Sequence, residues 1–231
     1  VYPMQLLLEA ARKSKLSPYV VFAGTATQCG LKKTLPITES VKDEPSTVYD
    51  FHKLLAENYL KYYTCKDLIK GTSLRLCNVY GPGPKTSSKD RGILNIMIKK
   101  ALDGENLTIY GNGNFQRDYI FMDDVVNAFL ACPCYPSKTN GRHFILGSGK
   151  GYSINQAINK VAQMIERHKG LRVKVVNIKT PENLLSIEHR NEVANNSGIS
   201  KATGWLPSIK LEEGIIKTVK SFTNDQNRRV K

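Results

Sequence analysis

Two residues that could transfer a proton, Tyr49 and Lys53, lie four positions apart and about two dozen residues after a strand-like run that ends at Thr25. A lysine one helical turn away can stabilise a tyrosine phenolate and lower the tyrosine pKa from its usual value of about 10. The spacing alone does not identify a site, because Tyr62 and Lys66 show it too. The Tyr62 pair has no upstream partner, so context has to decide between the two pairs.

Strand-like and helix-like segments alternate along the chain. Apolar runs rich in β-branched or aromatic residues predict strands, and apolar residues at helical spacing predict helices. Ser153 followed by Gln156 has the pattern of a capping box, which marks a helix start. The alternation predicts an α/β fold with a mainly parallel sheet. We expect strands at 19–23, 73–77, 107–110, 143–146 and 173–178, helices at 4–15, 46–65, 93–102, 123–131, 153–167 and 211–222, and a disordered tail at 224–231.

Length and cysteine content restrict the class of protein. The 231 residues are 41% hydrophobic, which is enough for one core, or for one domain and part of another. No apolar run approaches the roughly 18 residues of a membrane helix, so no membrane span is expected. Five irregularly spaced cysteines favour reduced thiols and a cytoplasmic location. Cys132 and Cys134 have no second pair and no histidine nearby, so no metal site is expected.

The net charge of +14 favours anionic partners. The positive residues are spread along the chain, and no zinc-finger, RNP or basic-zipper pattern is present, so nucleic acid is not the expected partner. A solvated basic surface explains the charge without any function. A phosphate-bearing small molecule is the functional explanation.

A glycine-rich segment, Gly147 to Gly151, lies between a strand and a helix, where a phosphate-binding loop would lie. It matches neither the dinucleotide-binding pattern nor the P-loop pattern. We therefore expect a turn in which glycine allows the backbone to pack closely.

Several segments, in order, resemble the NAD-dependent epimerase/dehydratase family, the extended short-chain dehydrogenases that act on nucleotide sugars. Residues 75–83 read Arg-Leu-Cys-Asn-Val-Tyr-Gly-Pro-Gly, close to a family motif, and residues 109–120 match a signature that ends in Arg-Asp-Tyr. Each match alone is weak, but the ordered set covers nearly the whole chain. The other matching segments are 7–12, 21–30, 36–39, 49–53 and 200–205.

The resemblance implies a division of the fold. Residues 1–80 and 115–145 would form the C-terminal part of a Rossmann-like NAD(P)-binding domain with a parallel sheet. Residues 81–114 and 146–223 would form a smaller α/β substrate-binding domain, and 224–231 a tail. The family's glycine-rich dinucleotide loop is not in this sequence, so we expect it roughly a hundred residues before Val1 in a longer protein. A homodimer through the helix at 46–65 is also implied.

The resemblance also assigns roles to individual residues. Tyr49 would take a proton from a sugar hydroxyl, Lys53 would hold the nicotinamide ribose and depress the Tyr49 pKa, and Thr25 would align the hydroxyl. The cofactor would be NAD, with NADP as the alternative, and the substrate a nucleoside-diphosphate sugar. The implied cofactor contacts are Ala23, Tyr49, Lys53, Leu76 and Cys77, and the implied substrate contacts are Thr25, Asn78, Tyr110, Arg117 and Arg190.

Each of these residues also has a structural explanation. Thr25 could cap the backbone at a strand end, and Asn78, at the end of the next strand, could cap a turn. Cys77 could be an ordinary buried thiol. Arg117 suits a phosphate because its guanidinium offers paired donors, but a salt bridge to Asp118 or Asp123 would also satisfy it.

The residues after Thr25 separate the possible reactions. Family dehydratases usually have Thr-Asp-Glu here, which supplies an acid and a base, whereas this chain has Thr25-Ala26-Thr27. Epimerisation, which oxidises and re-reduces one carbon, is therefore the implied activity. A keto-sugar reductase or dehydratase of the same family is the alternative. A non-catalytic relative that binds RNA or protein through its basic surface is the alternative from another class.

Overall fold

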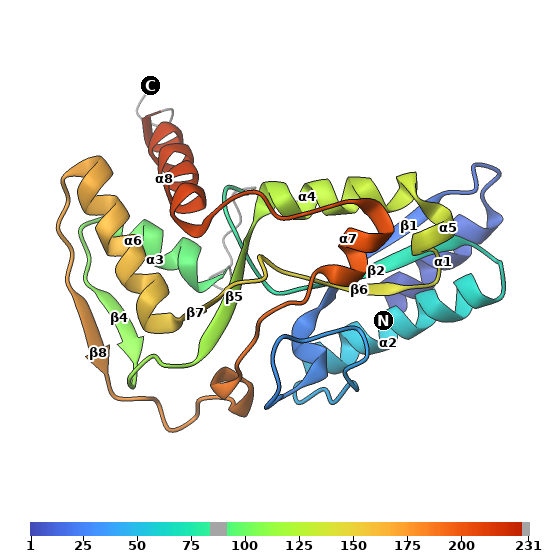
Figure 1. Cartoon of the computed structure of the whole chain (residues 1–231), viewed down its shortest axis with the longest axis horizontal. Coiled ribbons are helices and arrows are strands. Elements are labelled where there is room, and N and C mark those ends of the chain that lie inside the picture. Colours follow the sequence, from blue (N-terminus) through green and yellow to red (C-terminus); the bar gives the residue numbers. More distant parts are fainter. Residues whose placement is uncertain (84–91, 228–231) are drawn as a thin grey trace.

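The computed structural model describes residues 1–83 and 92–227. Three strands form a parallel sheet in the order β1-β2-β6, with β1 at Tyr19–Thr25, β2 at Lys70–Leu76 and β6 at His143–Leu146. Helices α1 (Tyr2–Lys13) and α2 (Val48–Cys65) cover one face of this sheet (Figure 1). The opposite face is covered by α4 (Met122–Ala131), α5 (Pro136–Thr139) and α7 (Ser197–Thr203).

Side-chain alternation along β1 explains why both faces are covered. Val20 and Phe22 pack into the cluster that α1 and α2 form, which includes Leu8 and Leu60. Tyr19 and Val21 pack on the other side, against the cluster that contains Leu74, Phe144 and Trp205. Because successive residues of a strand point to opposite faces, a strand that is apolar at nearly every position requires a helix layer on each side.

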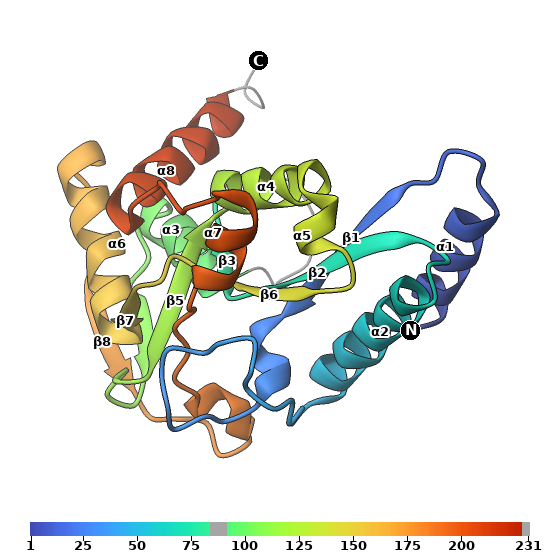
Figure 2. The same cartoon turned by 45° about the vertical axis from the view of Figure 1, so that its right-hand side comes forward.

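The remaining elements gather around a second core, at the left of Figure 1 and Figure 2. Strands β3 (Asn78–Tyr80), β5 (Gln116–Phe121) and β7 (Gly151–Ser153) form one small sheet, and β4 (Leu107–Tyr110) pairs in parallel with β8 (Val175–Ile178). Helices α3 (Ile93–Leu102), α6 (Ile154–Lys169) and α8 (Leu211–Asn227) pack on them. The core includes Tyr80, Leu94, Ile98, Ile109, Phe121, Ile158, Ile165 and Ile215. Three short 3₁₀ helices, η1 (Ala26–Cys29), η2 (Cys132–Cys134) and η3 (Ser186–His189), complete the described elements.

Most expected elements are present. The helix at 93–102 and the strands at 107–110 and 143–146 have the predicted bounds, and Ser153 forms the predicted capping box with Gln156. Strands β3, β5 and β7 were not predicted. The expected strand at 73–77 instead begins at Lys70 and ends at Leu76. Asn78 was wrongly placed at its end, since Asn78 opens β3 and only Cys77 separates the two strands.

The expected disordered tail was wrong in its first part. Helix α8 continues through Asn227, because the polar residues after Phe222 include no glycine or proline to end it. Residues 228–231 lie outside the described part of the chain.

The glycine-rich segment is a turn, as predicted. The backbone N–H groups of Ser148 and Gly149 donate to the two carboxylate oxygens of Asp118, at 2.6 and 2.9 Å. A Cβ atom at Gly147 would lie 2.4 Å from Asp118, so glycine is required for this close approach. The Asp118 carboxylate therefore accepts from the backbone N–H groups that a phosphate-binding loop would offer to its ligand.

A buried ion pair fixes α2 against the sheet. The guanidinium of Arg75 in β2 donates to both carboxylate oxygens of Glu57 in α2, at 2.6 and 3.0 Å, and Ser73 donates to the same carboxylate at 2.8 Å. Asp43 and Lys61 extend the network, with ion pairs of 2.8 and 2.7 Å. Burial opposes ionisation of Glu57, but the hydrogen bonds and charges of Arg75 and Lys61 outweigh it and lower the pKa of Glu57 to about 2.

Replacing Glu57 with Gln tests this contribution. Arg75 would stay buried with only Asp43 as a carboxylate partner, so we expect the free energy of unfolding to fall by about 3 kcal/mol at neutral pH. The folded pKa of about 2 lies below the usual value of about 4.3, so the ionised carboxylate stabilises the fold above pH 4.3 and loses this effect as the pH falls towards 2. Urea unfolding at neutral and acidic pH measures this, and the difference in unfolding free energy between wild type and Glu57→Gln should become smaller in acid.

Glu213→Gln is the matched control. Glu213 pairs with Lys217 at 3.2 Å on the surface of α8, with half of its side chain exposed, so its loss should cost less than about 1 kcal/mol. If Glu57→Gln and Glu213→Gln lost equal amounts of unfolding free energy, the buried pair would contribute no more to stability than a surface pair.

Candidate active site

The predicted residues gather at the carboxyl-terminal edge of the β1-β2-β6 sheet. Strand pairing places Thr25 beside Leu76, and Leu76 beside Leu146, so the three strands end together. Cys77 and Gly147 follow directly. Parallel α/β sheets bind their ligands at this edge, where loops leave the strands and diverge.

Helix α2 brings Tyr49 and Lys53 to this edge. Its first turn is fixed by Thr47, whose hydroxyl accepts from the backbone N–H of Asp50 at 3.1 Å and donates to the Asp50 carboxylate at 2.7 Å. Because the helix begins at Val48, Tyr49 and Lys53 lie in its first two turns. The Tyr49 side chain remains 59% exposed, so a ligand can reach it.

The Lys53 ammonium lies between the strand end and Tyr49. It donates to the carbonyl oxygen of Ala23 at 2.7 Å, and lies 5.1 Å from the ring centroid of Phe22 and 5.7 Å from that of Tyr49. Burial lowers the pKa of Lys53. An ammonium has three donors, and Ala23 is its one hydrogen-bond partner among the described residues. The other two N–H donors of the ammonium remain available to a ligand.

The role expected of Lys53, lowering the pKa of Tyr49, stays a prediction. Burial raises the pKa of Tyr49, and the negative charge of Asp50 raises it further, while a hydrogen bond with Thr25 acts in the opposite direction. The Lys53 ammonium is directed to the Ala23 carbonyl, so it does not offset these effects.

The competing pair lies elsewhere. Tyr62 and Lys66 are at the far end of α2, thirteen positions or ~20 Å along the helix axis from Tyr49 and Lys53. Lys66 is the residue that ends the helix, and Tyr62 packs edge-on against Tyr63 at 6.0 Å between ring centroids. Only the Tyr49 pair lies at a strand end beside a threonine hydroxyl.

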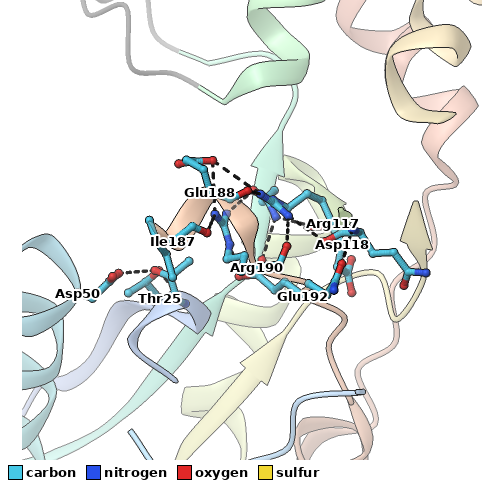
Figure 3. A network of polar contacts seen from close by, with 12 residues as sticks. Thr25, Asp50, Arg117, Asp118, Ile187, Glu188, Arg190 and Glu192 are labelled. Carbon is cyan, nitrogen blue, oxygen red and sulfur yellow. Dashed lines mark hydrogen bonds and ion pairs between the residues drawn. The ribbon is translucent and has the colours of Figure 1, made fainter. Parts of the chain in front are cut away.

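A second polar group forms around Glu192 (Figure 3). Asn78 donates to the Glu192 carboxylate at 2.8 Å and to the carbonyl oxygen of Asp118 at 3.2 Å. Arg190 donates to the other Glu192 oxygen at 3.2 Å and to the side-chain oxygen of Asn78 at 3.3 Å. Asn78 is therefore not the turn cap that its sequence position allowed. The structure brings together two of the predicted substrate contacts, Asn78 and Arg190, through a glutamate.

Arg117 joins this group from β5. Its guanidinium donates to the carbonyl oxygens of Glu188 at 2.8 Å and of Gln116 at 3.1 Å, and also to that of Arg190. Its ion pair is with Glu188, at 3.7 Å, rather than with Asp118 or Asp123. Burial lowers the pKa of Arg117, and the nearby charge of Arg190 adds to this effect. Arg117 therefore holds the segment that carries Arg190.

Cys77 lies between the two groups of polar residues. Its thiol is buried, and burial, followed by the charge of Glu192, raises its pKa well above the usual value. Its backbone N–H donates to the carbonyl oxygen of Leu146 at 2.9 Å. Burial also raises the pKa of Glu192.

Tyr110 stands apart from the other predicted residues: it is 53% exposed at the end of β4, and the contacts of the described residues connect it to none of them.

Sequence reasoning missed four residues of this region. Thr27 and Asp50 contact each other beside Thr25. Glu192 binds Asn78 and Arg190, and the Asp118 carboxylate holds the backbone of Ala194. A local signal existed for Asp50, which follows the helix-capping Thr47 by three positions, as an acidic residue of a first turn commonly does. Glu192 gave no local signal, because its partner Asn78 is 114 positions away.

Within residues 1–83 and 92–227, no group of His, Cys, Asp and Glu side chains is arranged to hold a metal ion. In the same part of the chain, no helix has the length and apolar character needed to cross a membrane.

Comparison with known proteins identifies the family. The profile of the NAD-dependent epimerase/dehydratase family matches residues 3–147, which include the Thr25, Tyr49 and Lys53 site. The chain belongs to this family. The resemblance inferred from the ordered motifs is thereby confirmed.

Individual relatives of the family are similar over nearly the whole chain. UDP-glucose 4-epimerase of Mycolicibacterium smegmatis is 28% identical over 218 residues, 94% of this chain and 66% of that protein. dTDP-4-dehydro-6-deoxyglucose reductase of Escherichia coli is 29% identical over 206 residues, 88% of this chain and 61% of that protein. The structure of UDP-glucose 4-epimerase of Thermotoga maritima with UDP-glucose superposes with a TM-score of 0.85 at 27% identity, covering 98% of this chain and 70% of that one.

The two Tyr-x-x-x-Lys pairs can be separated by mutation. In the natural protein that contains this chain, Tyr49→Phe should lower turnover by at least ~100-fold, because it removes a general base. Nucleotide-sugar affinity should change little, because the binding groups remain. Steady-state kinetics and equilibrium binding measure the two effects. Tyr62→Phe is the matched control and should leave turnover nearly unchanged. A similar loss of turnover in the two variants would rule out Tyr49 as the general base.

Proposed function

We propose that this chain carries the catalytic residues of an NAD-dependent nucleotide-sugar epimerase. The observation that carries the proposal is the position of Thr25, Tyr49 and Lys53 together at the carboxyl-terminal edge of the parallel sheet. In this proposal residues 1–80 and 115–145 are the Rossmann-like part of the cofactor domain. Residues 81–114 and 146–223 are the smaller substrate-binding domain, and the second core described above supports this division.

The side chains at the strand ends fit the nicotinamide end of NAD. Lys53 has donors to spare beyond its bond to Ala23, which suits the vicinal hydroxyls of a ribose. Leu76 and Cys77 lie at the adjoining strand end and would contribute backbone contacts. NAD, when bound, would supply the acceptor and then the donor of a hydride. NADP is the alternative cofactor.

The protein groups would move one proton. Tyr49 would take the proton of a sugar hydroxyl as the carbon that bears it is oxidised, and would return that proton when the carbon is reduced from the other face. Thr25 would hydrogen-bond the same hydroxyl and align it. The Lys53 ammonium would stabilise the phenolate once a ligand draws it from the Ala23 carbonyl.

The residues beside Thr25 favour epimerisation over dehydration. Expelling water from a sugar requires an acid and a base at neighbouring carbons, and Ala26 and Thr27 can supply neither. A keto-sugar reductase uses the same three residues, and the similarity to the Escherichia coli reductase keeps it as the second candidate. The presence of Thr25, Tyr49 and Lys53 in one site argues against a non-catalytic RNA- or protein-binding role.

Asn78, Arg117 and Arg190 are the proposed contacts of the nucleoside diphosphate, with Tyr110 beside the base or sugar. The two guanidinium groups are balanced in charge by the carboxylates of Glu188 and Glu192. A diphosphate, which carries one negative charge on each phosphoryl group, would replace the carbonyl or carboxylate partners of the arginines and could bind both guanidinium groups at once.

Arg117→Ala should weaken binding of a nucleoside diphosphate by roughly 1.5–3 kcal/mol, the size of a lost hydrogen bond to a charged group. Binding of the free sugar should not change. Calorimetry on the natural protein measures both, with Arg12→Ala as control, because Arg12 pairs with Glu9 on the exposed surface of α1. Unchanged diphosphate affinity would assign Arg117 to holding the 188–190 segment alone.

A homodimer in the cytoplasm is part of the proposal. Exposed apolar side chains lie on adjoining helices, Leu6 and Leu7 on α1, and Phe51 and Tyr62 on α2, and this surface suits association of two copies. All five cysteines are free thiols, which suits a reducing compartment.

The activity is tested by incubating the natural protein with a panel of nucleoside-diphosphate sugars and following them by NMR. We expect two stereoisomers to interconvert without net consumption of NADH, because the cofactor is restored in each turnover. A 4-keto-6-deoxy product would establish a dehydratase instead. Stoichiometric consumption of NADH or NADPH would establish the reductase.

A further inference from the structure

The strands β1, β2 and β6 begin together at the edge of their sheet that lies opposite the candidate active site. Strand pairing places Tyr19 beside Lys70, and the carbonyl oxygen of Arg142, just before β6, accepts from the Thr72 hydroxyl at 2.8 Å. The hydroxyl oxygens of Tyr19 and Thr139 are 2.7 Å apart, which joins the start of β1 to α5. The segments that lead into the three strands therefore lie side by side, at the right of Figure 1 and Figure 2. We call this the amino-terminal edge.

Six exposed cations lie at the amino-terminal edge, and among the described residues none of them forms an ion pair. The carboxylates near them are those of Asp67 and Glu9, and Glu9 is already paired with Arg12 at 2.7 Å. The edge therefore carries an excess of positive charge that the described part of the chain does not neutralise. The six cations are Lys13, Lys15, Lys66, Lys70, Lys138 and Arg142.

Helix ends explain half of this charge. Lys13, Lys66 and Lys138 lie at the C-terminal ends of α1, α2 and α5, where the helix dipole favours a cation. The other three cations lie outside the helices, so no helix end requires them. Their gathering at one edge of the sheet calls for a further explanation.

The same segments expose apolar and aromatic side chains beside the cations. Leu16 directly follows a lysine in the turn between α1 and β1 and is 88% exposed, and this turn projects at the upper right of Figure 2. Leu68 lies between two lysines of the turn between α2 and β2 and is 40% exposed. Tyr135 is 43% exposed, and the Lys138 ammonium lies 5.9 Å from its ring centroid. Exposed apolar groups and unpaired cations thus share one surface.

We propose that the amino-terminal edge docks on an anionic membrane surface. The cations would bind lipid headgroups, while Leu16, Leu68 and Tyr135 would enter the boundary between headgroups and acyl chains. A nucleic acid or an acidic protein would use the cations, but it would give an isolated, exposed leucine no apolar partner. A lipid surface uses both kinds of side chain, and therefore fits this edge better.

Docking at this edge would leave the candidate active site free. Strand β2 runs from Lys70 at the amino-terminal edge to Leu76 at the edge that carries the site. Its seven residues span ~20 Å, at about 3.3 Å per residue. A protein bound to lipid at one edge would still present the other to the solvent, so the proposal does not depend on which reaction the site performs.

Cosedimentation of the natural protein with lipid vesicles tests the proposal. We expect binding to vesicles that contain about 30% phosphatidylserine, weaker binding in high salt, and little binding to pure phosphatidylcholine. The double variant Lys13→Gln with Lys15→Gln should lower the partition coefficient by roughly 10- to 30-fold, since each lysine near an anionic surface contributes about fivefold. Leu16→Ser should lower it by at least about threefold, because the apolar contact is lost.

The matched control is Lys99→Gln with Lys169→Gln, which removes two exposed lysines of α3 and α6 at the second core. It should reduce binding by less than about twofold, because those lysines would face away from the lipid. All three variants change exposed side chains, so an unchanged Tm verifies that each is folded.

Three results would overturn the proposal. The first is the absence of binding to phosphatidylserine vesicles, or an equal loss in the control and in the Lys13 and Lys15 variant. The second is unchanged vesicle binding by Leu16→Ser, which would show that this edge attracts anions by charge alone. The third is salt-sensitive binding of single-stranded oligouridine in place of vesicles, which would assign the edge to nucleic acid.

Discussion

The buried ion pair between Arg75 and Glu57 is the constraint on which the site depends. Arg75 belongs to the middle strand of the sheet and Glu57 to the helix that carries Tyr49 and Lys53, and both side chains are fully buried. Removing two charges from water is costly, so such a pair is stable only with close to ideal geometry and further partners. Ser73, Asp43 and Lys61 supply these partners. Any displacement of α2 along the sheet would break several charged hydrogen bonds at once.

The position of α2 then determines the chemistry. Glu57 lies one turn beyond Lys53, so anchoring Glu57 at β2 places Lys53 and Tyr49 at the ends of β1 and β2. The Ala23 carbonyl holds the ammonium there, and the capping interaction of Thr47 with Asp50 fixes the first turn. A structural ion pair in the interior thus sets the distance between a helix and a strand end, and the proposed proton transfer depends on that distance.

The arginine group at the same edge follows a different principle. Arg117 and Arg190 carry the charge that would bind a diphosphate, yet each is engaged with protein oxygens, from the backbone or from Glu188 and Glu192. Partial neutralisation reduces the repulsion between two buried cations and orders the segment that carries Arg190. The net charge of +14 therefore gives little information about this site, where positive and negative groups are closely balanced.

Local patterns were enough to predict much of this arrangement. Apolar runs predicted the main strands, and helical spacing predicted the longer helices but not α5 and α7. The ordered motifs pointed to Thr25, Tyr49 and Lys53, which the structure brings together. Strands β3 and β7 were not predicted because three residues show too little periodicity. Strand β5 was not predicted because its first half, Gln116 to Asp118, is polar. The hydrogen bonds between Thr27 and Asp50 and between Asn78 and Glu192 were not predicted for another reason. These partners are 23 and 114 positions apart, and only the packing of helices and strands brings them into contact.

The central proposal is that the protein epimerises its substrate by oxidation and re-reduction of a single sugar carbon, with Tyr49 as the acid-base residue. The direct test is to run the isomerisation in D₂O and to measure the mass of the product by mass spectrometry. Oxidation and return at the same carbon keep its hydrogen away from solvent, so the product should carry no deuterium bound to carbon. Incorporation of one deuterium per turnover would mean that the carbon is deprotonated and reprotonated through solvent, and would contradict the role assigned to Tyr49 and Lys53.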